Sequence, residues 1–181
     1  INIKPNDMSQ RTEYAIKRAM KEDEVLQNID DFLKLLPQNN EELSKEMSSR
    51  VTPRSVKELR DNQVFVFGSN IAGHHSGAAA KQALLKWGAV WGLASGPQGR
   101  SYAIPTVSGK ANNVKLIEPY ARQFAQYARD HRDKTFLVTA VGCGNAGFTA
   151  EQVAPFFREC IDLPNVYLPE RFWGVLKNKG F

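Results

Sequence analysis

Short apolar runs alternate with amphipathic stretches from residue 52 to the end of the chain. The runs 64–67 and 135–141 are mainly apolar, which is typical of strands buried on both faces. Residues 114–131 instead carry apolar side chains at helical spacing. The pattern as a whole predicts strands at 64–67, 101–106, 135–141 and 165–168, and helices at 78–87, 114–131, 149–161 and 171–177.

Strands that alternate with helices of this length predict an α/β fold in three layers, with one sheet covered by helices on both faces. Ligands of such sheets bind beyond the carboxyl ends of the strands. The loops that follow 64–67 and 135–141 are therefore the places where functional residues are expected.

The first 51 residues have a different texture. Residues 9–50 contain no glycine and are rich in Glu, Lys, Gln and Leu. Ser9 is placed to cap a first helix, Pro37 to end a second, and a third short helix reaches Met47. The sequence thus predicts a helical appendage over 1–51 and an α/β domain over 52–181. The appendage could pack on the main domain, bind a protein partner or mediate self-association.

Charge points to an anionic ligand. Basic and acidic residues balance over 1–60, so the net charge of +5 belongs to the rest of the chain. A basic domain suits a nucleotide or a nucleic acid, although a solvated basic surface would look the same. The chain has no run of Lys and Arg and no aromatic RNA-binding motif, which disfavours a nucleic-acid partner.

Two cysteines, Cys143 and Cys160, are too few for a disulfide framework. Together with the absence of a long apolar run, this predicts a cytoplasmic protein without a membrane partner. No cluster of Cys, His, Asp and Glu suggests a metal site, and no cofactor is expected.

Two glycine loops are the most informative features. The first, 68–77, follows strand 64–67, and the second, 142–148, follows strand 135–141. Glycine lets the backbone approach a ligand closely and adopt positive φ. A predicted helix begins after each loop, and helix N-termini offer N–H groups and a positive dipole end to phosphate. The pair of loops predicts a site for a nucleotide that contains a diphosphate.

The first loop carries a motif that resembles a bacterial and phage family with the signature FVFGSN-x-x-G-x-H-x-x-GAA. It stands here as Phe65-Val66-Phe67-Gly68-Ser69-Asn70-Ile71-Ala72-Gly73-His74-His75-Ser76-Gly77-Ala78-Ala79. Later blocks of that family are matched by residues 99–106 and 141–148. The resemblance covers residues 64–169.

The layout of these blocks also resembles macro domains, which bind ADP-ribose. By this resemblance Asn70 lies near the distal ribose, Gly77–Ala80 form the first glycine segment, and Gly142–Phe148 surround the diphosphate. The chain departs from the macro-domain pattern in two places: Ser69-Asn70 replaces paired asparagines, and His74-His75 stands where consecutive glycines are common.

The resemblance implies a macro-domain-like sheet that binds ADP-ribose, a related nucleotide or an ADP-ribosylated macromolecule, and that hydrolyses an N- or O-glycosidic ADP-ribosyl bond. One alternative is a nucleotide sensor or sequestering protein without catalysis. Another is a nucleic-acid-binding or protein-interaction module.

Each candidate residue has a functional and a structural interpretation. The catalytic candidates are Asn70, His74, His75 and Glu151. In the functional interpretation Asn70 orients the ribose, and a histidine or Glu151 moves a proton. In the structural interpretation Asn70 is a turn residue, the histidines are loop residues and Glu151 caps a helix. Cys143 could be a nucleophile or a small packing residue, and Arg100 a phosphate contact or a surface charge. Trp87, Trp91 and Trp173 are interpreted as core residues rather than as base-stacking residues. The ligand-binding candidates are Gly68, Ser69, Gly73, Gly77, Ala78, Arg100, Gly142, Cys143, Gly144, Asn145, Ala146, Gly147 and Phe148.

Overall fold

The chain divides into two compact units, Ile1–Ser49 and Arg50–Phe181. The computed structural model describes residues 45, 47–109 and 112–181. The helices expected before residue 45 therefore lie outside the described residues. The second unit begins at Arg50, whereas the sequence places the start of the α/β domain at residue 52.

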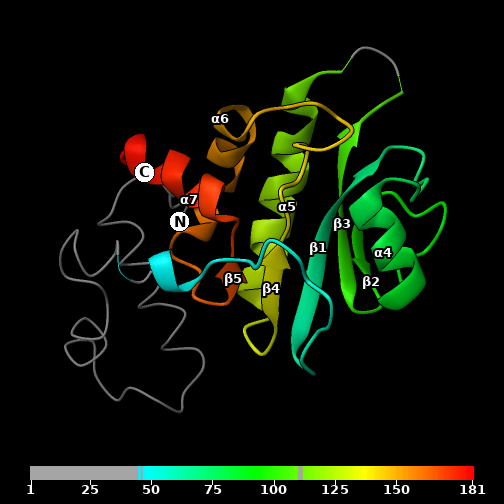
Figure 1. The fold of residues 1–181 in the computed structure, drawn as a ribbon, viewed down its shortest axis with the longest axis horizontal. Helices are drawn as coiled ribbons and strands as arrows, with labels where there is room; N and C mark the ends of the chain where they lie inside the picture. Colours follow the sequence, from blue (N-terminus) through cyan, green and yellow to red (C-terminus); the bar gives the residue numbers. More distant parts are fainter. Residues whose placement is uncertain (1–44, 46, 110–111) are drawn as a thin grey trace. The chain divides into compact units, whose positions relative to one another are not determined.

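The second unit is built on a five-stranded sheet in the order β2-β3-β1-β4-β5 (Figure 1). Each of the neighbouring pairs β3–β1, β1–β4 and β4–β5 is parallel, and β2 runs antiparallel to β3 at the edge. The strands are β1 (Gln63–Asn70), β2 (Gly96–Gln98), β3 (Ser101–Val107), β4 (Thr135–Val138) and β5 (Val166–Tyr167). The predicted α/β class is confirmed.

The helices of this unit are α4 (Ala78–Lys86), η1 (Val114–Leu116), α5 (Ile117–Asp130), α6 (Ala150–Val153), η2 (Ala154–Cys160) and α7 (Glu170–Asn178). The prediction of one continuous helix over 149–161 is wrong, because only α6 is α-helical and η2 is a 3₁₀ helix. Pro155 stands in the first turn of η2. Proline has no backbone N–H and its ring collides with the preceding turn, so the α-helix ends before it.

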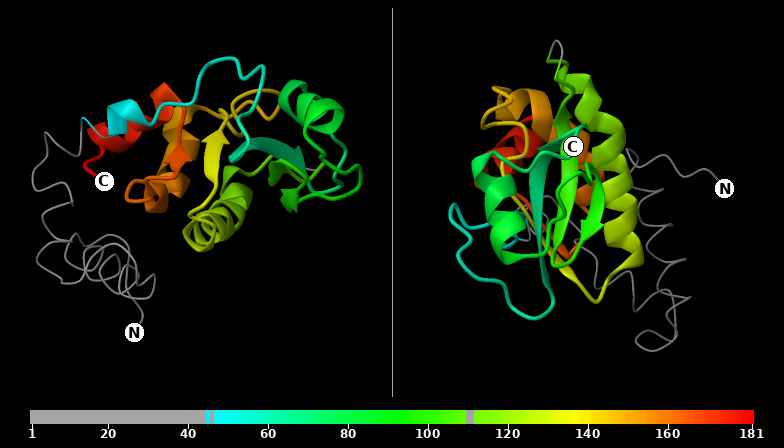
Figure 2. Two further views of the ribbon diagram at one scale, coloured as in Figure 1. Left: turned by 90° about the horizontal axis from the view of Figure 1, so that it is seen from below. Right: turned by 90° about the vertical axis from the view of Figure 1, so that its right-hand side faces the viewer.

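Alternating residues of β1 supply the two faces of the sheet. Phe65 and Phe67 belong to an apolar cluster that includes Ala83 and Trp87 of α4 and its C-terminal end. The rings of Phe65 and Trp87 lie 4.5 Å apart. Figure 2 shows α4 and α5 on opposite faces of the sheet.

The other face is packed by aromatic rings of α5. Phe124 is fully buried and its ring lies 5.2 Å from that of Tyr102 on β3 and 5.4 Å from that of Phe136 on β4. Burial of rings of this size contributes several kcal/mol to the core by the ordinary transfer estimate of about 25 cal/mol per Å². Helix α5 is therefore fixed across β3 and β4, and loop B follows the second of these strands.

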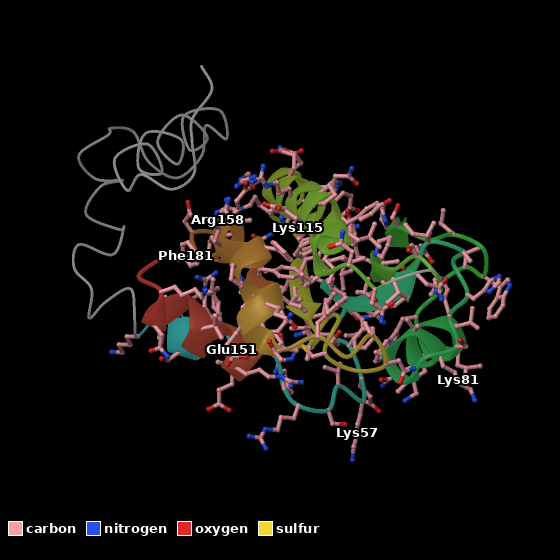
Figure 3. All side chains as sticks on the ribbon, turned by 90° about the horizontal axis from the view of Figure 1, so that it is seen from above. Lys57, Lys81, Lys115, Glu151, Arg158 and Phe181 are labelled. Atoms are coloured by element: carbon pink, nitrogen blue, oxygen red, sulfur yellow. The ribbon has the colours of Figure 1, made fainter. Side chains whose placement is uncertain are left out.

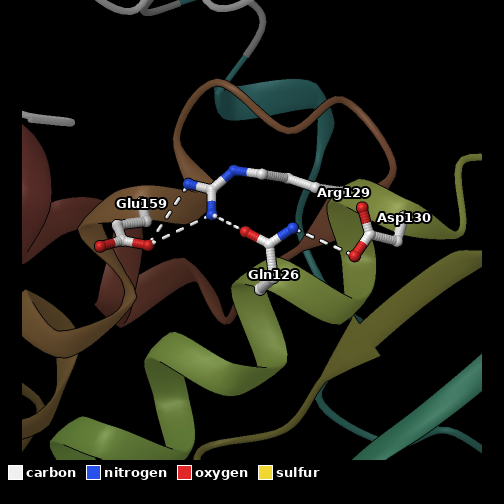
Figure 4. A network of polar contacts seen from close by, with 4 residues as sticks. All are labelled: Gln126, Arg129, Asp130 and Glu159. Carbon is white, nitrogen blue, oxygen red and sulfur yellow. Dashed lines mark hydrogen bonds and ion pairs between the residues drawn. The ribbon is translucent and has the colours of Figure 1, made fainter. Parts of the chain in front are cut away.

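A polar contact adds to this packing at the far end of α5. Arg129 and Glu159 of η2 form an ion pair of 3.3 Å, with side chains only 12% and 14% exposed. Arg129 also donates to Gln126, which in turn donates to Asp130 (Figure 4). The contact fixes η2 against α5.

Arg50 fastens the beginning of this unit to its C-terminal part. Its guanidinium is buried and donates to carbonyl oxygens at and beyond the end of η2, those of Cys160, Ile161, Leu163 and Val166. It lies 5.0 Å from the centre of the Trp173 ring, and Trp173 Nε1 donates to the Arg50 carbonyl at 2.6 Å. Carbonyls at a helix end need donors, and Arg50 supplies charged ones in addition to the backbone N–H groups that Cys160 O and Leu163 O accept.

The parallel strands β1, β3 and β4 end at one edge of the sheet, with Asn70, Val107 and Val138 as their last residues. We call residues 71–77, which follow β1, loop A and residues 139–149, which follow β4, loop B. Both loops therefore leave the sheet at its carboxyl edge, where ligands of α/β folds bind.

Candidate functional site

Loops A and B meet at the carboxyl edge. A Cβ placed on Gly77, at the end of loop A, would lie 3.3 Å from Nδ2 of Asn145 in loop B. A Cβ placed on Gly68 of β1 would lie 3.5 Å from the backbone nitrogen of Gly142. The structure thus brings together the two glycine segments that the sequence separates by more than sixty residues.

Loop B has a defined shape. Gly142 and Gly147 have φ of 77° and 78°, a left-handed conformation that glycine adopts without strain. The loop is closed by the N–H of Phe148, which donates to Gly142 O at 2.9 Å, and by that of Gly147, which donates to Gly144 O at 2.9 Å. Its curvature is therefore set by its own backbone.

The tip of loop B presents donors to solvent. The N–H groups of Gly144, Asn145 and Ala146 donate to no acceptor within the described residues. A Cβ on Gly144 would meet no described residue within 4 Å, and Asn112 Nδ2 donates to Ala146 O at 3.2 Å beside this tip. Consecutive N–H groups around an open space form an anion-binding concavity.

Helix α4 adds further donors next to this tip. Its N-cap is Gly77, which has no side chain to cap the helix, and its first turn, which begins at Ala78, contains no acidic residue. The first N–H groups of a helix lack an internal partner and lie at the positive end of the helix dipole. The α4 N-terminus, with these donors, thus begins beside the side chain of Asn145 in loop B.

The start of α6 behaves differently. Thr149 Oγ1 accepts from Gln152 N at 3.3 Å, and Gln152 Oε1 accepts from Thr149 N at 2.9 Å. In this capping box, side-chain oxygens accept from backbone N–H groups that the sequence analysis assigned to phosphate binding. Glu151 is exposed in the first turn of α6 (Figure 3), a position where the dipole favours a carboxylate.

Asn70 closes loop A. Its Oδ1 accepts from His74 N at 2.9 Å, and its Nδ2 donates to His74 O at 2.8 Å. Both polar atoms of the amide therefore already contact the loop backbone. These backbone contacts favour the interpretation of Asn70 as a turn residue.

The structure separates the two adjacent histidines. His74 is exposed, and its ring is stacked on that of Trp91 at 4.8 Å and 13°. His75 is only 1% exposed; its Nε2 lies 3.2 Å from Gln98 Oε1 and its ring meets the edge of Phe67. His75 therefore belongs to the core under loop A rather than to the loop surface.

Two further candidates, Ser69 and Gly73, connect loop A to the segment 88–95, which we call the tryptophan loop. Ser69 Oγ donates to Ala94 O, and Gly73 O accepts from Gly92 N at 2.9 Å. The tryptophan loop was not expected from the sequence, where Trp91 is interpreted as core. That interpretation is wrong, because Trp91 is 55% exposed.

Arg100 does not reach the site. It precedes β3, and its carbonyl accepts from Phe65 N at the opposite, amino edge of the sheet. Its guanidinium donates to the carbonyl oxygens of Leu59 and Arg60. The expected contact between Arg100 and a phosphate at the glycine loops is therefore replaced by a contact that holds the chain before β1.

Cys143 lies half-buried in loop B, and burial raises the pKa of its thiol. Arg171 at the start of α7 acts in the opposite direction, and Glu151 adds to the rise. Cys160 is buried, which raises its pKa to about 12. Neither thiol is poised as a thiolate at neutral pH, and the packing interpretation of Cys143 is the one that this environment favours.

We expect Cys143 to react slowly with iodoacetamide at neutral pH, and its rate to rise only at a pH above the ordinary thiol range. Replacing Glu151 by Gln removes a charge that raises this pKa, so alkylation should become faster. Arg171→Ala should make it slower, because the arginine lowers the pKa. Mass spectrometry of the labelled peptide over a pH series measures all three rates, and a titration at or below the ordinary thiol pKa contradicts the expectation.

Searches of protein-family models, curated proteins and solved structures give no match to this chain. Among the residues that the structure describes, no three His, Cys, Asp or Glu side chains come together as metal ligands. In the same residues no helix is both long and apolar enough to cross a membrane.

Proposed function

We propose that this chain binds ADP-ribose or a closely related diphosphate nucleotide, with the diphosphate at the junction of loops A and B. The observation that carries the proposal is the approach of Gly77, the N-cap of α4, to the side chain of Asn145 in loop B, which brings the start of this helix and loop B together at the carboxyl edge. Two phosphates need two groups of donors, and this junction has one from each loop.

The charge of the loops supports recognition by backbone dipoles. Residues 68–80 and 139–149 contain no Lys or Arg and no Asp or Glu. A phosphate there would be bound by N–H groups, without a competing carboxylate on either loop.

ADP-ribose is the first choice among diphosphate nucleotides because of the motif in residues 65–79 and its resemblance to macro domains. Asn70, which holds loop A, lies at the end of β1 and next to the proposed junction. A nucleotide with a distal ribose would extend from the diphosphate toward this residue.

Binding has stronger support than hydrolysis. Asn70 is engaged by loop A, His75 is buried, and the pKa of the Cys143 thiol is raised. A hydrolase that cleaves an ADP-ribosyl bond would have to use His74 or Glu151 as its acid–base group, since both are exposed. The sensor or sequestering function requires no such group.

The test is the affinity of Gly144→Val for ADP-ribose by calorimetry. No described residue lies within 4 Å of a Cβ at this position and φ is not left-handed, so we expect the fold to be retained while the side chain enters the proposed phosphate space. We expect binding to weaken by roughly 100-fold, or about 2.7 kcal/mol. Gly174→Val is the matched control, because a Cβ on Gly174 of α7 also meets nothing within 4 Å.

The control should bind as tightly as the unchanged protein. Equal affinity of Gly144→Val and Gly174→Val for ADP-ribose would contradict the proposed site. Failure of the unchanged protein to bind ADP-ribose, ADP or NAD would contradict the proposed function.

A further inference from the structure

The tryptophan loop presents an apolar surface next to loop A. Trp91 is 55% exposed, Val90 51% and Leu93 43%, and Ile71 of loop A is 42% exposed. Large apolar side chains gathered in this way on a surface mark a binding site more often than isolated ones do. We call these four residues together with His74 the stacking surface.

The loop is held in place by its own contacts. Gln98 Oε1 accepts from Val90 N at 2.8 Å, and Gln98 Nε2 donates to Leu93 O at 2.8 Å. Gln98 is itself buried and lies beside His75. The exposure of Trp91 is thus set by a preorganised backbone, which is how a binding group is held ready for its ligand.

The geometry of the surface suits a flat ring. The rings of Trp91 and His74 lie nearly parallel, 13° apart at 4.8 Å between centres. Offset parallel stacking is a favoured arrangement of aromatic rings, and a nucleobase stacks on an aromatic side chain in the same way. Because the two rings already contact each other, a base would stack on the face of Trp91 that His74 does not cover.

The charge of the surroundings indicates a neutral ring. Residues 69–77 and 88–98 contain no Lys, Arg, Asp or Glu. The phosphates of a nucleic acid strand laid across this surface would find no cation in either segment, whereas protein–nucleic acid affinity depends on such contacts. A nucleobase whose phosphates are bound at the junction of loops A and B needs no cation at this surface.

We propose that Trp91 and His74 bind a nucleobase of the nucleotide whose diphosphate lies at the junction of loops A and B. The assignment rests on the proposed function, because His74 belongs to loop A and places the surface at the border of that site. Ile71, Val90 and Leu93 surround the base and exclude water from the stack.

Tryptophan fluorescence reports this contact directly. Of the three tryptophans, Trp87 is 6% and Trp173 2% exposed, so a ligand at the surface reaches Trp91. We expect ADP-ribose and AMP to quench the emission, and ribose 5-phosphate, which has no base, to leave it unchanged. Trp91→Ala should weaken ADP-ribose binding by about 5- to 150-fold, the range of one base–aromatic stack, and Trp91→Phe should restore most of the affinity.

Leu85→Ala is the matched control, because Leu85 is 73% exposed on α4, outside the stacking surface. It should change neither quenching nor affinity. Circular dichroism of each variant confirms that the fold is retained. An unchanged affinity of well-folded Trp91→Ala for ADP-ribose would overturn the inference.

Four other results distinguish this inference from the proposed function. Quenching by AMP in a protein that shows no preference for diphosphates would support the stacking surface while contradicting the diphosphate site. ADP-ribose binding without quenching would overturn the surface alone. If a short single-stranded oligonucleotide quenches the emission more strongly than ADP-ribose does, the surface binds nucleic acid. If Trp91→Ala converts an oligomer to a monomer, the surface serves self-association. Either result would overturn the inference.

Discussion

Replacing Arg50 by alanine is expected to lower the free energy of unfolding by about 3–5 kcal/mol, because several buried carbonyl oxygens lose a charged donor and each hydrogen bond to a charged group contributes about 1.5–3 kcal/mol. The carbonyl oxygens of Cys160, Ile161, Leu163 and Val166 would lose the guanidinium as a donor, and those of Cys160 and Leu163 would keep only a backbone N–H. The ring of Trp173 would lose the guanidinium that lies 5.0 Å from its centre. Urea denaturation followed by circular dichroism measures the loss.

Arg54→Ala is the control for this substitution. Arg54 forms an ion pair of 3.7 Å with Glu170, and both side chains are almost fully exposed, so its removal should cost less than about 1 kcal/mol. Arg50→Lys should lie between the two, because lysine keeps the charge but cannot fork to several carbonyls. Similar unfolding midpoints for Arg50→Ala and Arg54→Ala would show that the buried contacts contribute little.

The role of Arg50 also changes how the appendage should be removed. The sequence places the start of the α/β domain at residue 52, and a chain shortened to that point would lack the donor for four carbonyls. Loss of binding by such a chain would then reflect loss of stability. A chain that begins before Arg50 separates the two effects.

Periodicity was sufficient to predict the elements that depend on local pattern. β1 and α5 lie close to their expected positions because an apolar run and an i, i+3, i+4 pattern define them without reference to the rest of the chain. The same rule missed β2, whose Gly96-Pro97-Gln98 sequence has no strand propensity and is held by pairing with β3. The break between α6 and η2 was marked in the sequence by Pro155.

The glycine loops could be located because glycine composition and strand ends are both visible in the sequence. The residues that hold these loops in place could not be located from the sequence. His75 contacts Gln98, twenty-three residues away, and Arg50 contacts carbonyls more than a hundred residues away. Such contacts follow from the folded chain, so residue type alone could not tell the exposed His74 from the buried His75.

Arg100 is a different case, because the sequence contained enough information to place it away from the glycine loops. It stands immediately before a predicted strand, and the residue before a parallel strand lies at the amino edge of the sheet, opposite the carboxyl edge where ligands bind. The order of residue and strand therefore excludes Arg100 from the loops that follow β1 and β4. Proximity in sequence to a motif was a weaker guide than the direction of the strand.

Gly73→Ala is expected to destabilise the fold by more than about 2 kcal/mol and to displace the tryptophan loop. Gly73 has φ of 69°, which costs a residue with a Cβ about 1–2 kcal/mol. A Cβ there would also lie 2.5 Å from the carbonyl carbon of Gly92 and 2.7 Å from the nitrogen of Leu93. These are backbone atoms, so loop A and the tryptophan loop would have to separate.

Gly109→Ala has the first of these causes without the second. Gly109 has φ of 78° but no described residue within 4 Å of a Cβ, so alanine there adds the backbone strain without the collision. Gly73→Ala should therefore unfold at a lower urea concentration than Gly109→Ala, and its Trp91 emission should shift as the stack with His74 opens. If the two variants unfold together with unchanged emission, the close approach of the loops does not set the position of Trp91, and the preorganisation assigned to the stacking surface has to come from Gln98 alone.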